Sequence, residues 1–435
     1  MVKFSRADFS IETIVNFSFI TCIFLALGSI QLPFIDIYYY YIFVIVVFPI
    51  IFLRFLTIDK WLLIISVYLF ILGIVNIFLG NNDIYSFLKV YVGYFIFFYF
   101  YYLIIKIKEY NLNSLFNIYY KFAIFHAYVG MIQLFSYAIG FKFGYDYTWL
   151  GLRVMAPSEI AGTVLYPINA LTGEPAAFVF VQSAAMYLAL VKIFKAKAPI
   201  IGSKLDAFII LITFLLSQSS TGYFALFISI GLVFSNSISF KKIFVAGFVL
   251  SVTLYSLVNF VPKFQSRFIT IISLITGKIY VDATYGENAA GSSLILFNHF
   301  LIANQNAKDH PFGTGMGSHH LAFERYNFLK TWFTGYGPDS VVLNVHDASS
   351  LFNRILSEMG YIGIVAMFFF LVKFFLKNGY YEFVIINNAS LVVLFTALLR
   401  SGHYFICGLP FFFLCYYYSK VLSERYNSSN NDLLI

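Results

Sequence analysis

The chain has 435 residues, of which 60% are hydrophobic, 21% aromatic and 11% charged, and its formal net charge is +8. Soluble domains are about half apolar and about a quarter charged, so this composition excludes a water-soluble globular fold and requires lipid as the solvent for much of the surface. Cys22, Cys407 and Cys415 lie in apolar runs without metal-ligand spacing, which indicates buried thiols and no disulfide framework.

Long apolar runs predict an all-α, polytopic membrane protein. Crossing about 30 Å of hydrocarbon requires about 20 residues, and about twelve runs approach this length. They cover residues 13–31, 37–56, 61–79, 86–105, 118–140, 176–194, 205–219, 221–236, 243–261, 355–373, 383–399 and 403–419. The first run follows Lys3 and Arg6 but lacks a small-residue cleavage site, so we expect an anchor and not a cleaved signal.

The basic residues between these runs predict the orientation. With the N-terminus inside, most lysines and arginines fall in inner loops, whereas the outer turns at 32–36, 80–85 and 219–221 carry none. Arg400, in the last outer turn, is the one exception. By the positive-inside rule both termini are cytoplasmic, and the basic charge is a signal of topology, with no nucleic-acid surface implied.

Two outer segments are longer than turns, and they define the domain organisation. Residues 1–261 form nine spans with an outer loop at 141–175, residues 262–354 form a large outer loop, residues 355–420 form three spans, and 421–435 form a cytoplasmic tail. A structureless loop of about ninety residues is uncommon unless it has a function. Helical apolar spacing at 266–276, 292–306 and 319–333 instead predicts a small helical cap.

The stretch NVHDASSLFNRILSEMGYIGIV at 344–365 places polar residues before an apolar span. Arg354 and Glu358 are spaced i, i+4 and therefore share a helix face. In a purely structural interpretation, Asp347 or Ser349 caps the helix and Arg354–Glu358 is a surface pair. In a functional interpretation, His346 accepts a proton from an incoming hydroxyl, because an imidazole titrates near neutral pH.

Four arginines lie in the outer segments, whereas the inner loops carry mostly lysine. They are Arg153, Arg267, Arg325 and Arg354. Arginine suits planar, bidentate contact with phosphate, so these residues are candidates for a diphosphate site. The structural alternative is that each only anchors a helix end at the membrane interface.

Three further motifs have structural explanations. In LTGEPAAFVF at 171–180, Glu174 and Pro175 suit the first turn of a helix. In QSSTGY at 218–223, the hydroxyls, including that of Thr221, would satisfy helix ends. HPFGTGMGS at 310–318 is not a P-loop, because no Lys-Ser/Thr follows the glycines. The histidines near it lack cysteines or paired carboxylates at ligand spacing, so no metal site is predicted.

In this order the motifs resemble those of the Wzy-type O-antigen polymerase and O-antigen ligase superfamily. The matching pieces are the GEP before a mid-chain span, the S-x-TG turn, HPFGTGMG in a large outer loop, His-Asp, and SEMGYIGI opening a span, over about residues 150 to 370. The chain departs from the family where an arginine of the S-x-TG turn is replaced by Ser219 or Ser220, and where His310 and Asp347 replace asparagines. An Arg-x10-Gly spacing typical of polymerases is approached after Arg325 but not matched.

The resemblance implies an inverting, metal-independent glycosyltransferase, without a cofactor, at the periplasmic face of a bacterial inner membrane. The implied donor is a glycan on undecaprenyl pyrophosphate, and the expected partners are this lipid, membrane lipids, a chain-length regulator and a flippase. His346 and Glu174 would be catalytic, and Asp347, Glu358 and Thr221 would support them. The arginines proposed above for a diphosphate would bind the pyrophosphate.

The departures from the ligase pattern favour a polysaccharide polymerase, which transfers the chain to a lipid-linked repeat unit. A ligase would transfer it to lipid A-core. A lipid-linked oligosaccharide flippase or another transporter is the alternative from a different class, although transporters tend to show paired halves and ionisable groups in mid-membrane. A non-catalytic scaffold for export is a further alternative, which would leave the ordered motifs unexplained.

Overall fold

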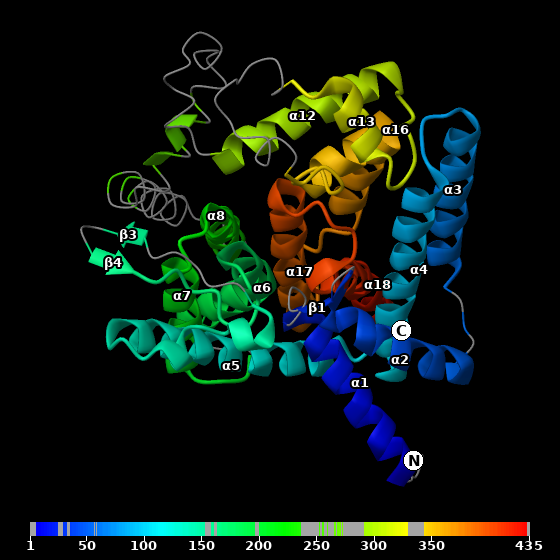
Figure 1. Ribbon diagram of the computed structural model, residues 1–435. Helices are drawn as coiled ribbons and strands as arrows, with labels where there is room; N and C mark the ends of the chain where they lie inside the picture. Colours follow the sequence, from blue (N-terminus) through cyan, green and yellow to red (C-terminus); the bar gives the residue numbers. More distant parts are fainter. Residues whose placement is uncertain are drawn as a thin grey trace.

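The computed structural model is a helical assembly with two short β-hairpins (Figure 1). It describes residues 6–24, 29–32, 35–55, 57, 59–152, 158–160, 163–195, 200–235, 291–328 and 343–432, together with isolated positions between 252 and 272. The expected all-α class is therefore confirmed for this part of the chain.

The described helices follow the predicted apolar runs, except for two that lie in the predicted large outer loop. They are α1 (Arg6–Phe24), α2 (Tyr39–Phe55), α3 (Lys60–Phe78), α4 (Ile84–Ile107), α5 (Leu112–Ala138), α6 (Pro175–Phe194), α7 (Lys204–Leu216), α8 (Ser220–Ser235), α12 (Gly291–Asp309), α13 (His319–Tyr326), α16 (Leu351–Lys373), α17 (Tyr381–Arg400) and α18 (Leu409–Asp432), with 3₁₀ turns η1 (Lys142–Gly144), η2 (Thr148–Leu150) and η4 (Ile406–Gly408). The hairpins are antiparallel: β1 (Ser29–Leu32) with β2 (Ile35–Tyr38), Ser29 opposite Tyr38, and β3 (Ser158–Ile160) with β4 (Thr163–Leu165), Ser158 opposite Leu165.

Six helical segments are long and apolar enough to cross a membrane: α3, α4, α6, α16, α17 and Ile406–Ser428, which contains most of α18. The other helices that coincide with predicted spans are shorter or less apolar, and the predicted ninth span at 243–261 lies almost entirely outside the described residues. The chain is thus a membrane protein with at least these six spanning candidates. The count of twelve stays a prediction.

The spanning helices differ in how much of their surface faces other helices. About four fifths of α6 is buried, because it packs against α7, α8 and α17, whereas only 28% of the apolar window of α3 is buried. Figure 1 shows α3 at the edge of the assembly, beside α4. Trp61, Leu63 and Ile71 of α3 remain exposed, as expected for a helix that faces lipid.

The predicted helical cap is confirmed in part. α12 occupies the predicted segment 292–306 and α13 begins where the segment 319–333 begins, while in the predicted segment 266–276 the structure describes residues 266, 268–270 and 272, all of them helical. Figure 1 shows α12 and α13 lying across one end of the assembly, where both contact α16.

The last predicted span begins later than expected. The apolar run starts at 403, but the helix α18 starts at Leu409 and then extends through the predicted tail to Asp432. Cys407 (φ 53°) and Gly408 (φ 72°) have left-handed backbone conformations, which interrupt any helix. Residues 401–405 consequently form a loop at the end of α17 where the charge pattern predicts the outer face.

Candidate functional site

The glycine-rich loop 310–318 packs against α16 backbone to backbone. Gly315 N–H donates to the carbonyl of Glu358 (2.8 Å), and Tyr361 N–H donates to the carbonyl of Pro311 (3.0 Å). A Cβ on Gly360 would lie 2.1 Å from the Pro311 carbonyl oxygen, and Gly360 has φ 66° and ψ −160°. Only glycine fits such a crossing. Two motifs that were separate in the sequence thus form one structural unit, which positions the first turns of α16.

Those first turns carry a buried ion pair. Arg354 Nε lies 3.0 Å from Glu358 Oε1, and the two side chains are 5% and 0% exposed. Arg354 Nη1 donates to the Gly402 carbonyl (2.9 Å), while the Tyr404 hydroxyl donates to Glu358 Oε2 (2.8 Å). Burial, and then the charge of Glu358, raise the pKa of Tyr404 well above its usual value. The prediction that Arg354 and Glu358 share a helix face is correct. The structural interpretation, in which they form a surface pair, is wrong, because both side chains are buried. The Arg354 guanidinium is already engaged within the protein.

An imidazole–carboxylate pair lies beside it. His403 Nε2 lies 3.1 Å from Asp347 Oδ2, and the Ser349 N–H donates to Asp347 Oδ1 (2.9 Å). Burial alone raises the pKa of Asp347, but the hydrogen bond and the charge of His403, the Ser349 hydrogen bond and the charge of Arg354 outweigh it and lower that pKa. Asp347 is therefore ionised at neutral pH. The helix cap is one residue beyond Ser349, because Ser350 accepts the Asn353 N–H (3.2 Å).

His346 lies next to this pair on the solvent side. The His346 side chain is exposed, and its ring centroid is 5.4 Å from that of His320. Partial burial and the positive charges of His320, Lys89 and Arg354 lower the pKa of His346, against the opposite effect of Asp347. The imidazole is then mostly neutral at pH 7 and able to accept a proton.

His320 joins the cap to the turn before α4. Its Nε2 lies 3.0 Å from Asp83 Oδ2, and its Nδ1 contacts the Gly317 carbonyl (2.9 Å). Deeper in the cap, His299 Nδ1 and His319 Nε2 are 2.9 Å apart. Burial lowers the pKa of both His299 and His319, so they pair as neutral rings.

Two groups from other spans reach the same region. Glu174 is the N-cap residue of α6 with Pro175 in the first turn, as predicted, and its side chain is exposed and makes no cap hydrogen bond. Arg400, the last residue of α17, interacts electrostatically with both Glu174 and Asp347. Its Nη1 donates to the Ser292 carbonyl of α12 (3.2 Å).

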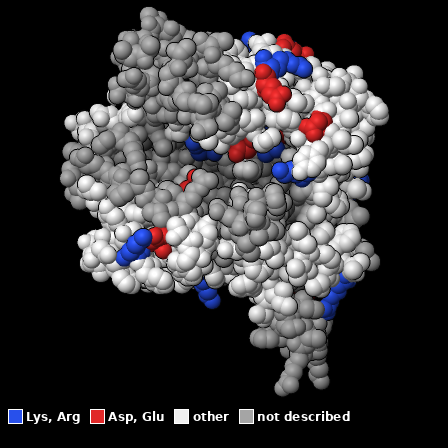
Figure 2. Space-filling model, in the orientation of Figure 1, with Lys and Arg blue, Asp and Glu red and all other residues white. Residues whose placement is uncertain are grey.

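We call this set of residues the polar cluster: Lys89, Glu174, His346, Asp347, Arg400 and His403. Its members come from α4, α6, α17 and the loops before α16 and after α17. In Figure 2, side chains of both charges line a hollow in the face of the molecule. Such a site offers cations for an anionic group and imidazoles for proton transfer. Within the described residues, no group of three or more His, Cys, Asp or Glu side chains could hold a metal ion.

The remaining predicted site residues have no described contact with the polar cluster. Arg325 is exposed and contacts His310 (3.4 Å between Nη1 and Nε2) and the ring of Tyr326. Thr221 is buried in the first turn of α8, which packs on α6. Arg153 and Arg267 lie outside the described residues, so their roles stay predictions.

Sequence reasoning missed three members of the polar cluster, although each left a signal. Lys89 is the one charged residue within the run 86–105, and Arg400 was the exception to the charge rule. Ionisable groups in or beside spans are functional candidates by default. His403 was counted as part of a span, although Gly402 and Gly408 around it indicate a break.

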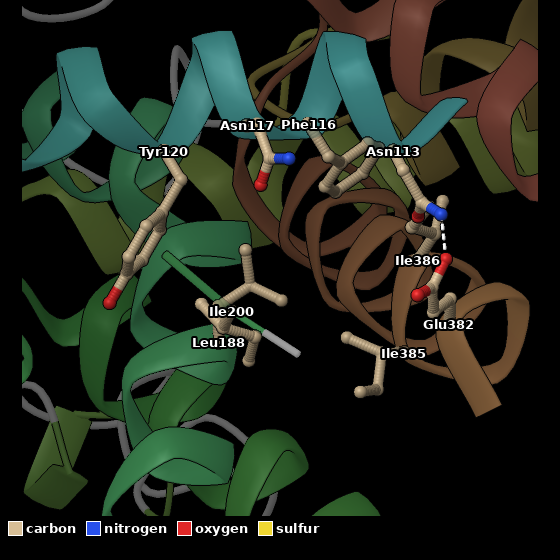
Figure 3. A pocket seen from close by; sticks show the side chains of 9 residues that line it. All are labelled: Asn113, Phe116, Asn117, Tyr120, Leu188, Ile200, Glu382, Ile385 and Ile386. Carbon is tan, nitrogen blue, oxygen red and sulfur yellow. Dashed lines mark hydrogen bonds between the residues drawn. The ribbon is translucent and has the colours of Figure 1, made fainter. Parts of the chain in front are cut away.

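A pocket lies at the other end of the helices. Asn113, Tyr120, Leu188 and Glu382 are among its lining residues. Figure 3 shows Asn113 from α5 turned toward Glu382 from α17, to which it donates a hydrogen bond. Glu382 and Arg400 are at opposite ends of α17, roughly 27 Å apart along the axis. The pocket is thus separate from the polar cluster.

Comparisons with protein-family models, curated proteins and solved structures find no match for the chain. The family that its motifs resemble therefore remains a prediction, and the polar cluster is what the functional argument rests on.

Proposed function

We propose that the chain is a polysaccharide polymerase, a membrane glycosyltransferase that acts on lipid-linked glycans. It transfers the growing glycan from undecaprenyl pyrophosphate to a second lipid-linked repeat unit at the outer face of the inner membrane. The order of the sequence motifs and the polar cluster support the same reaction.

One observation carries the proposal. Residues from four separate segments interact electrostatically in the polar cluster, and every one of those segments is at the end of a span that the charge pattern predicts to be outer. Lys89 is in the second turn of α4, Glu174 is the N-cap of α6, and Arg400 is the last residue of α17. A lipid-borne diphosphate is located at this level of a bilayer, where its glycan extends into water.

The groups of the cluster suit the steps of such a transfer. Negative charge grows on the diphosphate as its bond to the sugar breaks, and nearby cations stabilise that charge. Arg400 and Lys89 fill this role here, because Arg354 is enclosed by Glu358 and Gly402. A neutral imidazole of the cluster takes the proton of the attacking hydroxyl, and Glu174 orients that hydroxyl.

A deletion strain tests the reaction class. Without the chain, we expect loss of long surface polysaccharide and accumulation of lipid-linked single repeat units exposed at the outer face, detected by gel electrophoresis and mass spectrometry of the lipid extract. Re-expression of the chain restores long glycans. A membrane-impermeant sugar oxidant reports the face, because it labels only the outer leaflet.

The alternatives give different outcomes in the same strain. A ligase deletion accumulates long glycans still attached to the lipid. A flippase deletion accumulates single repeat units that the oxidant cannot reach. Either result would refute the polymerase assignment.

One substitution tests the cationic role. Arg400→Gln is expected to lower the transfer rate at limiting donor about 10- to 100-fold, as for the loss of a charged hydrogen bond. Arg425→Gln, near the opposite end of the bundle, is the matched control. Equal activity of the two variants would remove Arg400 from the site.

A further inference from the structure

Three consecutive residues after α17 are each held by a different residue of the segment that opens α16. The Gly402 carbonyl accepts from Arg354, the His403 imidazole pairs with Asp347, and the Tyr404 hydroxyl donates to Glu358. The segment that opens α16 therefore holds both the backbone and the side chains of this loop.

The backbone of Gly402 packs directly against the backbone of Asp347. A Cβ on Gly402 would lie 1.5 Å from the Asp347 carbonyl oxygen, so the two chains cross in direct contact. Gly402 and Tyr404 are buried, whereas 44% of the His403 side chain is exposed. Of the three residues, His403 alone is both fixed in orientation and open to an incoming molecule.

The nitrogens of His403 are differentiated by their surroundings. Nε2 faces the Asp347 carboxylate at 3.1 Å. A carboxylate accepts the Nε2 proton, which leaves the lone pair on Nδ1. Nδ1 makes no hydrogen bond to any residue that the structure describes. An ionised carboxylate in this position fixes the ring and stabilises the imidazolium that forms on proton uptake.

Four other histidines, at positions 299, 319, 320 and 346, lack this combination. Both ring nitrogens of His320 are taken, by Asp83 and Gly317. His299 and His319 are buried. His346 is exposed but makes no hydrogen bond within the described part of the chain, so nothing fixes the orientation of its ring.

We propose that His403 is the general base of the glycosyl transfer and that Asp347 positions it. This inference rests on the proposed function. The acceptor hydroxyl gives its proton to His403 Nδ1, and its oxygen forms a new bond to the anomeric carbon of the donor. The anomeric carbon–oxygen bond to the diphosphate breaks, its electron pair leaves with the lipid diphosphate, and the anomeric configuration inverts. The imidazolium then releases the proton to water.

In this assignment Arg354 and Glu358 are positioning residues. They hold Gly402 and Tyr404 on either side of His403, and so they act on the reaction through the loop. This role explains why the Arg354 guanidinium, near the start of α16, contacts groups of the protein itself.

The test uses the purified full-length chain with lipid-linked repeat units extracted from the deletion strain. His403→Ala and His403→Gln are both expected to lower the transfer rate about 10²- to 10⁴-fold, the usual contribution of a general base. The amide of a glutamine donates to Asp347 and holds the loop, so the Gln variant separates base from scaffold. His310→Ala, an imidazole outside the cluster, is the control with unchanged rate.

Two readouts separate chemistry from structure. Binding of undecaprenyl pyrophosphate in detergent micelles, followed by tryptophan fluorescence, should be retained in both His403 variants. Imidazole added at tens of millimolar should restore part of the rate to His403→Ala and none to His403→Gln. Asp347→Asn should lower kcat with little change in KM.

The outcomes are distinct. Full activity of His403→Gln, or rescue by imidazole of His346→Ala but not of His403→Ala, would overturn the inference while the polymerase assignment stands. A wild-type chain that leaves the extracted repeat units unjoined would instead overturn the proposed function, and the inference with it.

Discussion

Removing one partner of the buried Arg354–Glu358 pair should destabilise the protein as much as removing both. The two side chains are 5% and 0% exposed, with 3.0 Å between Nε and Oε1. Taking away one partner leaves an uncompensated buried charge, which costs about 3–5 kcal/mol. Glu358→Leu also leaves the Tyr404 hydroxyl without its acceptor.

Replacing both residues removes both charges. Arg354→Met with Glu358→Leu leaves only the Gly402 carbonyl and the Tyr404 hydroxyl unpaired, at about 1 kcal/mol or more each. We therefore expect the double variant to lose about 2 to 3 kcal/mol, no more than either single variant, whereas the single losses sum to about 6 to 10 kcal/mol.

The measurement is unfolding of the purified chain in mixed micelles by SDS titration, followed by far-ultraviolet circular dichroism. Glu424→Leu is the matched control, because Lys420 and Glu424 form an ion pair of the same i, i+4 spacing in which 64% of the Glu424 side chain is exposed. Its midpoint should not change. Single variants as stable as the wild type, or a double variant that loses the full sum, would refute the reasoning.

Three further predictions concern the surroundings of the site. Gly360→Ala should destabilise the chain by about 1–2 kcal/mol because of its positive φ alone, and by more because of the contact with the Pro311 carbonyl. Gly231→Ala, with open space around the glycine, is the control and should leave the stability unchanged. Equal SDS midpoints for the two variants would contradict this. Because the pKa of Asp347 is lowered on folding, its contribution to stability is complete above its unfolded value of about 3.9 and is lost as the pH falls toward the folded value. The stability difference between wild type and Asp347→Asn should thus be constant from about pH 5 to 6 and shrink below about pH 4, and a difference independent of pH would exclude an ionised Asp347. Lys89→Met should raise the pKa of His346, since the lysine charge lowers it; the pH dependence of the imidazole Cε1 proton shift checks this, and an unchanged midpoint would remove Lys89 from the cluster.

The sequence predicts the helices well and their termini less well. Apolar runs define α3, α4, α6, α16 and α17 to within a few residues, because lipid requires continuous apolar stretches. The same signal concealed the loop 401–405. The single imidazole in SGHYFICGLP hardly changes the mean hydropathy of the run. No sequence pattern indicates the left-handed backbone of Cys407, after which α18 begins.

The members of the polar cluster were predicted in part. The spacing of Arg354 and Glu358 correctly places them on one face, but their burial depends on Gly402 and Tyr404, which follow 48 and 46 residues later. Such a contact has no local sequence signal. His346 and Asp347 were found because they stand together in a polar stretch, whereas their neighbours Lys89, Arg400 and His403 each stand alone in apolar surroundings.

The crossing of the loop 310–318 with α16 limits how this protein can change. Side chains usually absorb a larger neighbour by shifting or by being replaced with smaller ones. At this crossing the loop and α16 already meet through glycines or backbone carbonyls, at Gly313, Gly360 and Pro311. Neither segment therefore has a side chain that a smaller one could replace to make room for a larger neighbour. The separation between the loop 310–318 and α16 is therefore fixed by the thickness of two peptide planes.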